Sequence, residues 1–259
     1  MLVIALMTGL LPIAFCQQPT VIQRFPVALA TQAVAVNKHY FYVINNSTIT
    51  QYEKKTGQLK GAYDGTKAGI KHLNSGVVLN GKLYCANSNF PGVPMTSSIE
   101  IFDAATLKHI GNHSFGIAVQ GSVTWIDQKN GYWWVGFAQY SGEHASSGKD
   151  NSWTTVLKFD KKWHQMEAWV FPKNVVHSFG TMSNSGGVWG KDGYLYCTGH
   201  DKNEIYVMQI PDKGYTLRYV RTIQAPIHGQ GIAVDHSERD KFIMYGINKP
   251  QKIVEFEIK

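Results

Sequence analysis

The sequence lacks the patterns that identify several common classes of protein. No stretch carries the 3.6-residue apolar periodicity of an amphipathic helix, so no helix of useful length competes with strands for the fold. A Gly-x-Ser-x-Gly elbow is missing, which excludes an α/β-hydrolase triad. A P-loop and a dinucleotide-binding glycine fingerprint are missing as well. The chemistry must therefore come from residues that the fold brings together.

Acidic residues are also few, at 18 against 25 lysines and arginines, which gives a formal net charge of +7. The basic residues are scattered over strand ends and turns, and the chain has no helix-turn-helix, zinc-finger or aromatic-plus-basic RNA motif. We therefore expect no nucleic-acid partner. The scarcity of acids also disfavours glycosidase chemistry, which needs two carboxylates at a set separation.

A repeated pattern, with a period about the length of one propeller blade, fills most of the chain. Each of five copies has a small, polar, Gly-rich step into an apolar strand, then an aromatic-rich strand and a third strand that often alternates apolar and polar residues. The aligned positions lie 43, 46, 65 and 44 residues apart, at Val34, Val77, Val123, Val188 and Ile232. Propeller blades repeat at about 40–50 residues, and a polar insertion at 141–153 lengthens the third copy. The sequence predicts an all-β, five-bladed β-propeller.

A fourth strand follows in copies one to four but not in the last copy, where the chain stops. One unassigned strand remains, at residues 20–25, just before the first repeat. We predict that this N-terminal strand completes the last blade, because an open sheet edge would otherwise invite aggregation. Residues 20–259 then form a single domain, which we expect to be a monomer.

Residues 1–16 are almost wholly apolar and uncharged, and too short to span a bilayer as a mature helix. They are typical of a signal peptide cleaved after Cys16, with lipidation of Cys16 as the alternative, and they predict a secreted or periplasmic protein without a transmembrane segment. The mature chain keeps Cys85 and Cys197, at equivalent positions of non-neighbouring blades. We expect two buried thiols and no disulfide.

Candidate site residues lie before the first strand and after the second strand of each blade, because both positions face the same end of the central channel. Most carry a carboxamide or an imidazole, which suits a sugar, a carboxylate or an amide. The predicted ligand-binding residues are Gln32, Asn45, Asn74, Asn87, Asn89, Gln139, Tyr140, His177, Asp201, Gln230 and Asn248. Such residues also line propeller channels merely to hold ordered water, and that alternative stays open.

Histidines at these positions offer a second chemistry. His72, His200 and His228 come from separate blades and could together hold zinc or another divalent metal with an open position for water. Without a metal, His72 and His228 are the candidate catalytic acid and base, because imidazole titrates near neutral pH. The alternative to a shared site is that the three histidines lie apart at the rim, each bonded to backbone carbonyls. Two functions follow: binding of a small polar ligand or carbohydrate in the central channel, or a hydrolase, lyase or cyclase at a His/Asn site.

Three short stretches resemble the secreted five-bladed propellers of the glutamine cyclotransferase type. They are Thr-Gln-Ala-Val at 31–34, Tyr-Phe-Tyr at 40–42 and Tyr-Glu-Lys-Lys-Thr-Gly at 52–57. The resemblance implies the blade plan and a central polar pocket. It implies no catalytic residue, because the strand that holds the family's catalytic Glu reads Tyr-Val-Ile-Asn at 42–45 and has no carboxylate.

Overall fold

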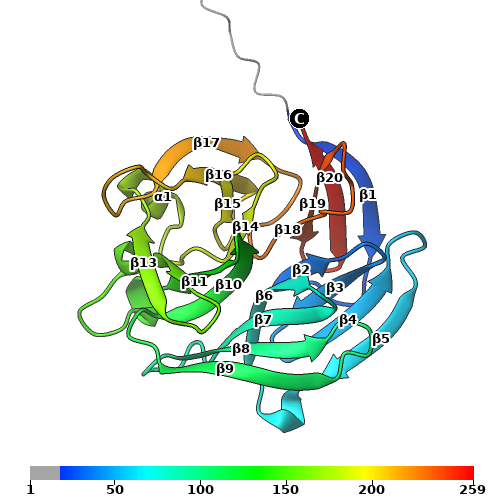
Figure 1. Ribbon diagram of the computed structural model, residues 1–259, viewed down its shortest axis with the longest axis horizontal. Helices are drawn as coiled ribbons and strands as arrows, with labels where there is room; N and C mark the ends of the chain where they lie inside the picture. Colours follow the sequence, from blue (N-terminus) through cyan, green and yellow to red (C-terminus); the bar gives the residue numbers. More distant parts are fainter. Residues whose placement is uncertain (1–17) are drawn as a thin grey trace, which may run out of the picture.

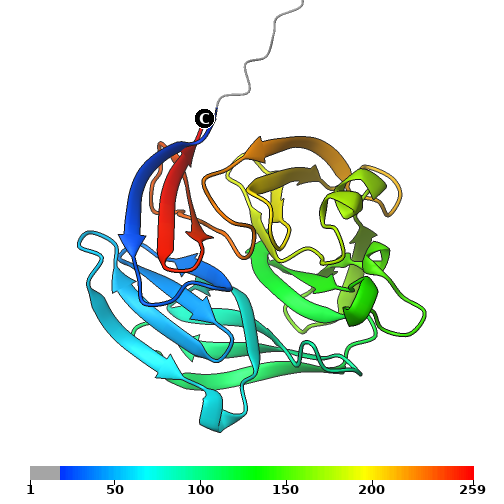
Figure 2. The same cartoon turned by 180° about the vertical axis from the view of Figure 1, so that it is seen from behind.

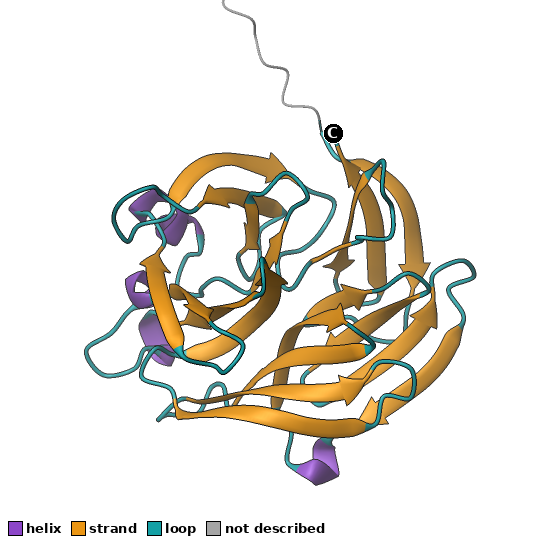
Figure 3. Cartoon of the chain, viewed as in Figure 1, coloured by secondary structure: helices purple, strands orange, loops and turns teal. Residues whose placement is uncertain are grey.

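The computed structural model describes residues 18–259, which form five four-stranded antiparallel sheets arranged around a common axis (Figures 1 and 3). The predicted five-bladed β-propeller is confirmed. Residues 1–16, the predicted signal peptide, lie outside the described part of the chain.

Each blade runs from an inner strand at the axis to an outer strand at the rim. Blade one contains β2 (Ala33–Val36), β3 (Tyr40–Asn45), β4 (Thr48–Glu53) and β5 (Leu59–Asp64). Blade two contains β6 (His72–Leu79), β7 (Lys82–Ser88), β8 (Thr96–Asp103) and β9 (His109–Ile117). Blade three contains β10 (Ser122–Lys129), β11 (Tyr132–Ala138), β12 (Thr155–Phe159) and β13 (Gln165–Val170).

Blade four contains β14 (Gly186–Trp189), β15 (Leu195–Thr198), β16 (Glu204–Gln209) and β17 (Arg218–Gln224). Blade five contains β18 (Ala233–Val234), β19 (Phe242–Asn248), β20 (Lys252–Ile258) and, at the rim, β1 (Thr20–Pro26). Short helical turns occupy the connections: η1 (Thr66–Ala68), η2 (Gly142–His144), η3 (Asn151–Trp153) and α1 (Lys173–Ser178).

The ring closes through β1, which pairs antiparallel with β20 as the strand count predicted (Figures 1 and 2). Phe25 lies opposite Ile253 in the register and is almost fully buried. Its ring lies 4.7 Å from that of Phe41 in blade one. The N-terminal strand therefore joins the last blade to the first through side-chain packing as well as backbone hydrogen bonds.

The inner strands fill the axis rather than enclosing a wide channel. Residues of β2, β6, β10, β14 and β18 line a central cavity of about 30 Å³. That volume has room for no more than about two water molecules. At the level of the strands, the axis is too narrow for the small ligand that the sequence led us to expect there.

Polar contacts between blades reinforce the apolar core. Trp125 of blade three donates its indole N–H to the Asn184 side chain at 2.5 Å, and the Trp189 backbone N–H donates to Asp127 at 2.7 Å. Burial raises the pKa of Asp127 to about 6. Cys85 and Cys197 are both buried free thiols, as expected.

Two local features differ from the sequence analysis. The first strand of blade five is only two residues long, because Gly229 and Gln230 adopt left-handed backbone conformations, with φ of 56° and 67°. A six-residue helix, α1, forms in the connection between blades three and four, where no helix was expected. Neither feature changes the blade count.

Candidate functional site

The two ends of the ring carry different loops. The entry face is formed by the segments that precede the inner strands and by the turns between second and third strands. The exit face is formed by the turns between first and second strands and between third and fourth strands. The predicted carboxamides and histidines before the inner strands or after the second strands lie at the entry face, apart from His177, which is exposed on α1.

Several predicted ligand-binding carboxamides are engaged in holding loops. Asn45 accepts hydrogen bonds from the Thr31 backbone N–H and hydroxyl, each at 2.8 Å. Asn89 accepts from the Thr96 backbone N–H at 2.8 Å and donates to the Pro94 carbonyl at 3.0 Å. These bonds set the shape of the entry-face turns. The two amides therefore stabilise loops and already use part of their hydrogen-bonding capacity within the protein.

Of the remaining carboxamides, some bond to loops and others lie near the central axis. Gln139 donates to the Val119 carbonyl at 3.3 Å and accepts from Ser146 at 2.7 Å, while Asn248 donates to the Pro226 carbonyl at 3.4 Å.

Near the axis, Asn74 is buried and donates to the Val123 carbonyl at 3.4 Å, and Gln32 donates to Asn46 at 3.0 Å. Gln230 is 1 % exposed, and its side-chain nitrogen has no hydrogen-bond partner in the described structure.

The histidines gather loosely at the entry face. His72 is partly buried; burial, with a smaller contribution from His200, lowers the pKa of its imidazole to about 4. Burial, Lys249 and His228 lower the pKa of His200, against the effect of Asp201, whose carboxylate lies 2.5 Å from the His200 ring. These imidazoles therefore share an electrostatic environment that disfavours protonation.

The metal site predicted from His72, His200 and His228 does not form as a ligand cluster. Between residues 18 and 259, no group of three or more His, Cys, Asp or Glu side chains is arranged to hold a metal ion. The three imidazoles come from different blades, His72 from the start of β6 and His200 and His228 from loops. His72 instead packs against Phe90, with ring centroids 5.2 Å apart, and Phe90 contacts Tyr140 at 4.7 Å.

His72 makes a pH dependence predictable. Its folded-state pKa of about 4 lies below the ordinary 6.5, so its contribution to stability is complete above pH 6.5 and is lost as the pH falls toward 4. We expect His72→Gln to reduce the loss of unfolding free energy between pH 7 and pH 5 by about 1 kcal/mol, allowing for the partial exposure of the ring. Urea unfolding at the two pH values measures the difference. An equal loss in both proteins would contradict the assignment.

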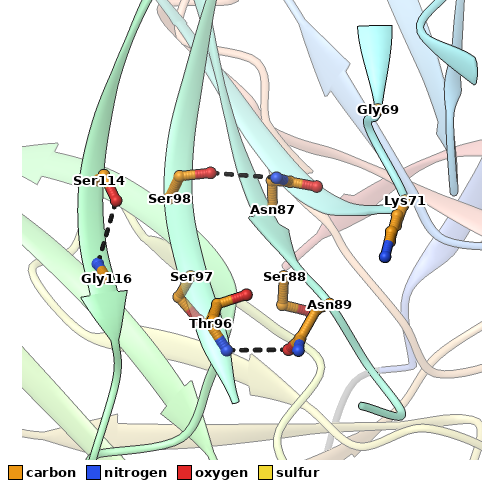
Figure 4. Close-up of a pocket in the computed structure, with 10 residues that line it drawn as sticks. All are labelled: Gly69, Lys71, Asn87, Ser88, Asn89, Thr96, Ser97, Ser98, Ser114 and Gly116. Atoms are coloured by element: carbon orange, nitrogen blue, oxygen red, sulfur yellow. Dashed lines mark hydrogen bonds between the residues drawn. The ribbon is translucent and has the colours of Figure 1, made fainter. Parts of the chain in front are cut away.

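A polar pocket lies in blade two at the entry face (Figure 4). Its volume is about 330 Å³. Strands β7, β8 and β9 and the segment that leads into β6 supply the walls, which are Gly69, Lys71, Asn87, Ser88, Asn89, Thr96, Ser97, Ser98, Ser114 and Gly116. Hydroxyl and amide groups and one lysine line it, and no carboxylate does. The predicted residues Asn87 and Asn89 belong to this pocket.

Asn87 lines this pocket, and hydrogen bonds within blade two set the orientation of its amide. Its side-chain nitrogen donates to the Ser98 hydroxyl at 3.0 Å, and Ser98 donates in turn to Glu100 at 2.6 Å. The other Glu100 oxygen lies 2.7 Å from a ring nitrogen of His109. Because the Ser98 proton is committed to Glu100, the Asn87 amide must point its nitrogen at Ser98, as Figure 4 shows. The Asn87 Oδ1 atom is buried and has no hydrogen-bond partner in the described structure.

Some of these pocket residues escape sequence reasoning. Lys71 was not singled out, although it directly precedes His72, and Ser98 and Ser114 belong to the third and fourth strands. The residues predicted from the sequence lie only before the first strand or after the second strand of a blade. A signal existed in the hydroxyl-rich run Thr-Ser-Ser at 96–98, which replaces apolar residues at the start of β8.

Comparisons with known proteins identify the fold. No family model matches the sequence, and no curated protein matches it. A luciferin-regenerating enzyme is similar in structure with a TM-score of 0.51 and 9 % identity, over 92 % of this chain and 95 % of that one. The hydrazine synthase of Kuenenia stuttgartiensis gives 0.50 and 11 %, over 83 % and 80 %. At these identities the likeness shows the propeller fold alone, and it does not confirm the glutamine cyclotransferase resemblance.

The helices of residues 18–259 are all short, and none is long and apolar enough to cross a membrane.

Proposed function

We propose that this protein binds a small neutral polyhydroxy ligand, a sugar, in the blade-two pocket. The observation that carries the proposal is the buried, unpartnered Oδ1 of Asn87 in a pocket lined by hydroxyl and amide groups. A buried acceptor without a partner costs about 1–3 kcal/mol, so a ligand that donates a hydrogen bond to it gains affinity.

The lining selects among the three ligand classes that the sequence allowed. Asn87 needs a donor, which a carboxylate at neutral pH does not supply, while the ammonium group of Lys71 offers donors to ligand oxygen atoms. A sugar hydroxyl both donates and accepts. The volume of about 330 Å³ lies at the lower end of the range for small-molecule sites, as a monosaccharide requires.

The same lining favours binding over catalysis. The nearest acid in the hydrogen-bond chain is Glu100, which is buried behind Ser98 and occupied by His109. A glycosidase would need two carboxylates on either side of a sugar. Export stays part of the proposal, since residues 1–16 carry the leader pattern and both remaining thiols are buried away from oxidants.

Asn87→Ala tests the proposal. We expect the variant to weaken binding of the best ligand by about tenfold, because the acceptor for one ligand hydroxyl is removed. The probes are glucose, galactose, mannose and N-acetylglucosamine, titrated by calorimetry. Asn112→Ala is the matched control, because Asn112 is an exposed asparagine on β9 outside the pocket lining. Failure of every sugar to bind, or equal weakening by both variants, would remove the proposal.

A further inference from the structure

A further pocket lies at the entry-face end of blade one, beside the segment that joins β1 to β2. Its volume is about 320 Å³. The lining consists of Ala28, Leu29, Asn45, Thr48, Thr50, Ala62, Tyr63 and Asp64. None of these residues lines the Asn87 pocket, so the two sites can be tested separately.

Small side chains on blade one create this pocket. Thr48 lies opposite Asp64 in the β4–β5 register. Thr50 lies opposite Ala62, so all four side chains share one face of the blade. Tyr52, two residues further along β4, points to the same face and belongs to the apolar core shared with blade five. The threonines and the alanine are smaller, and they leave the entry end of that joint unfilled.

The segment between β1 and β2 forms the other wall and is fixed in place. Asn45 donates to the Leu29 carbonyl at 3.2 Å and accepts from the Thr31 backbone N–H at 2.8 Å. The Ala30 backbone N–H donates to the Pro250 carbonyl at 2.7 Å. Because blades one and five both hold this wall, the pocket is formed before a ligand arrives, and binding requires little reordering of the protein.

Asp64 is the only charged residue in this lining. Its Oδ1 atom accepts hydrogen bonds from the Thr66 hydroxyl at 2.6 Å and from the Thr66 backbone N–H at 2.9 Å. These bonds, with a smaller contribution from Lys67, lower the pKa of the carboxyl group, so it is ionised at neutral pH. Among residues 18–259, no cation lies within ion-pairing distance of this exposed carboxylate.

We infer that this blade-one pocket binds a small aliphatic amine. The ammonium group of the ligand pairs with Asp64, whose Oδ2 atom accepts no hydrogen bond from the described residues. The alkyl chain lies against the aliphatic groups of the lining and covers Leu29, which is 47 % exposed. Carboxylates and phosphates are disfavoured, because no lysine or arginine lines the pocket.

Titration of the full chain at pH 7 with n-butylamine, 1-butanol and butyrate tests the inference, followed by the backbone amide NMR signals of Thr50 and Ala62. We expect both signals to shift with butylamine and neither to shift with butyrate. Butanol should bind about three- to fivefold more weakly than butylamine, because an exposed ion pair adds only a modest amount of affinity. An equal response to butylamine and butyrate would overturn the inference.

Asp64→Asn removes the charge and keeps an oxygen atom that can accept both hydrogen bonds from Thr66. We expect this variant to bind butylamine about three- to fivefold more weakly, at the level of butanol. Asp103→Asn is the matched control. Asp103 accepts from the Thr106 hydroxyl at 2.7 Å and backbone N–H at 2.8 Å in a turn of blade two, outside the lining, and its variant should bind butylamine like the parent. Unchanged binding by Asp64→Asn would contradict the pairing with the ammonium group.

Ala62→Leu fills the pocket without touching Asp64. Ala62 is exposed on the rim strand β5, so we expect the unfolding midpoint to stay the same. Butylamine binding should weaken by about tenfold or more, because the new side chain takes the place of the alkyl chain. If the variant binds butylamine as the parent does, the amine lies elsewhere and the inference fails. Asn87→Ala should leave butylamine binding unchanged, so failure of sugar binding in blade two is a separate result.

Discussion

Phe25→Ala should lower the free energy of unfolding by about 3–5 kcal/mol, the usual cost of removing a buried phenylalanine ring. Phe25 is 2 % exposed, lies opposite Ile253 in blade five and contacts Phe41 in blade one. The cavity therefore opens at the joint between the first and last blades, which the chain crosses between β1 and β2. Urea denaturation followed by tryptophan fluorescence measures the change.

Ile22 supplies the control for this experiment. It belongs to the same strand, β1, but is 48 % exposed, so Ile22→Ala removes little buried surface. We expect its effect to stay within about 1 kcal/mol. Similar losses from both variants would mean that β1 contributes only its backbone pairing. No loss from Phe25→Ala would mean that the ring does not depend on this joint.

The blade plan could be predicted from the sequence because it rests on local patterns. Each blade repeats the same order of apolar and aromatic strands, and the periodicity survives a 65-residue spacing between the third and fourth copies. The pairing of β1 with β20 is a long-range contact, yet counting strands predicted it, because only one strand was unassigned and only one sheet was incomplete.

The candidate sites were only partly predictable because side-chain partners decide them. Asn87 was expected to bind a ligand, but the direction of its amide depends on Ser98, Glu100 and His109 on two other strands. No local pattern encodes that chain. The convergence of His72, His200 and His228 at one face was predicted, while their failure to form a metal-ligand cluster depends on loop shapes.

The Trp125 ring packs between blades three and four, and two glycines leave the space that it occupies. Its side chain is fully buried and donates its indole N–H to Asn184 in blade four. Gly136 of β11 and Gly187 of β14 both face the indole, and a Cβ atom at either position would overlap it. The glycines at 186–187 therefore allow a side chain to approach the backbone closely. The structure identifies the approaching group as the Trp125 ring.

Gly187→Ala should therefore lower the free energy of unfolding by about 4 kcal/mol. The added methyl group would lie within 2.7 Å of the Trp125 Cζ2 atom, so the ring must shift. Overpacking costs about 1–3 kcal/mol, and the loss of the buried bond to Asn184 costs a similar amount. Gly111→Ala on β9 is the control, because a Cβ there meets nothing within 4 Å, and it should change stability by less than about 1 kcal/mol. Urea unfolding gives both values, and near-ultraviolet circular dichroism follows the Trp125 environment. An unchanged tryptophan signal in Gly187→Ala would show that the indole does not depend on this glycine, and the two blades would then be joined by other contacts.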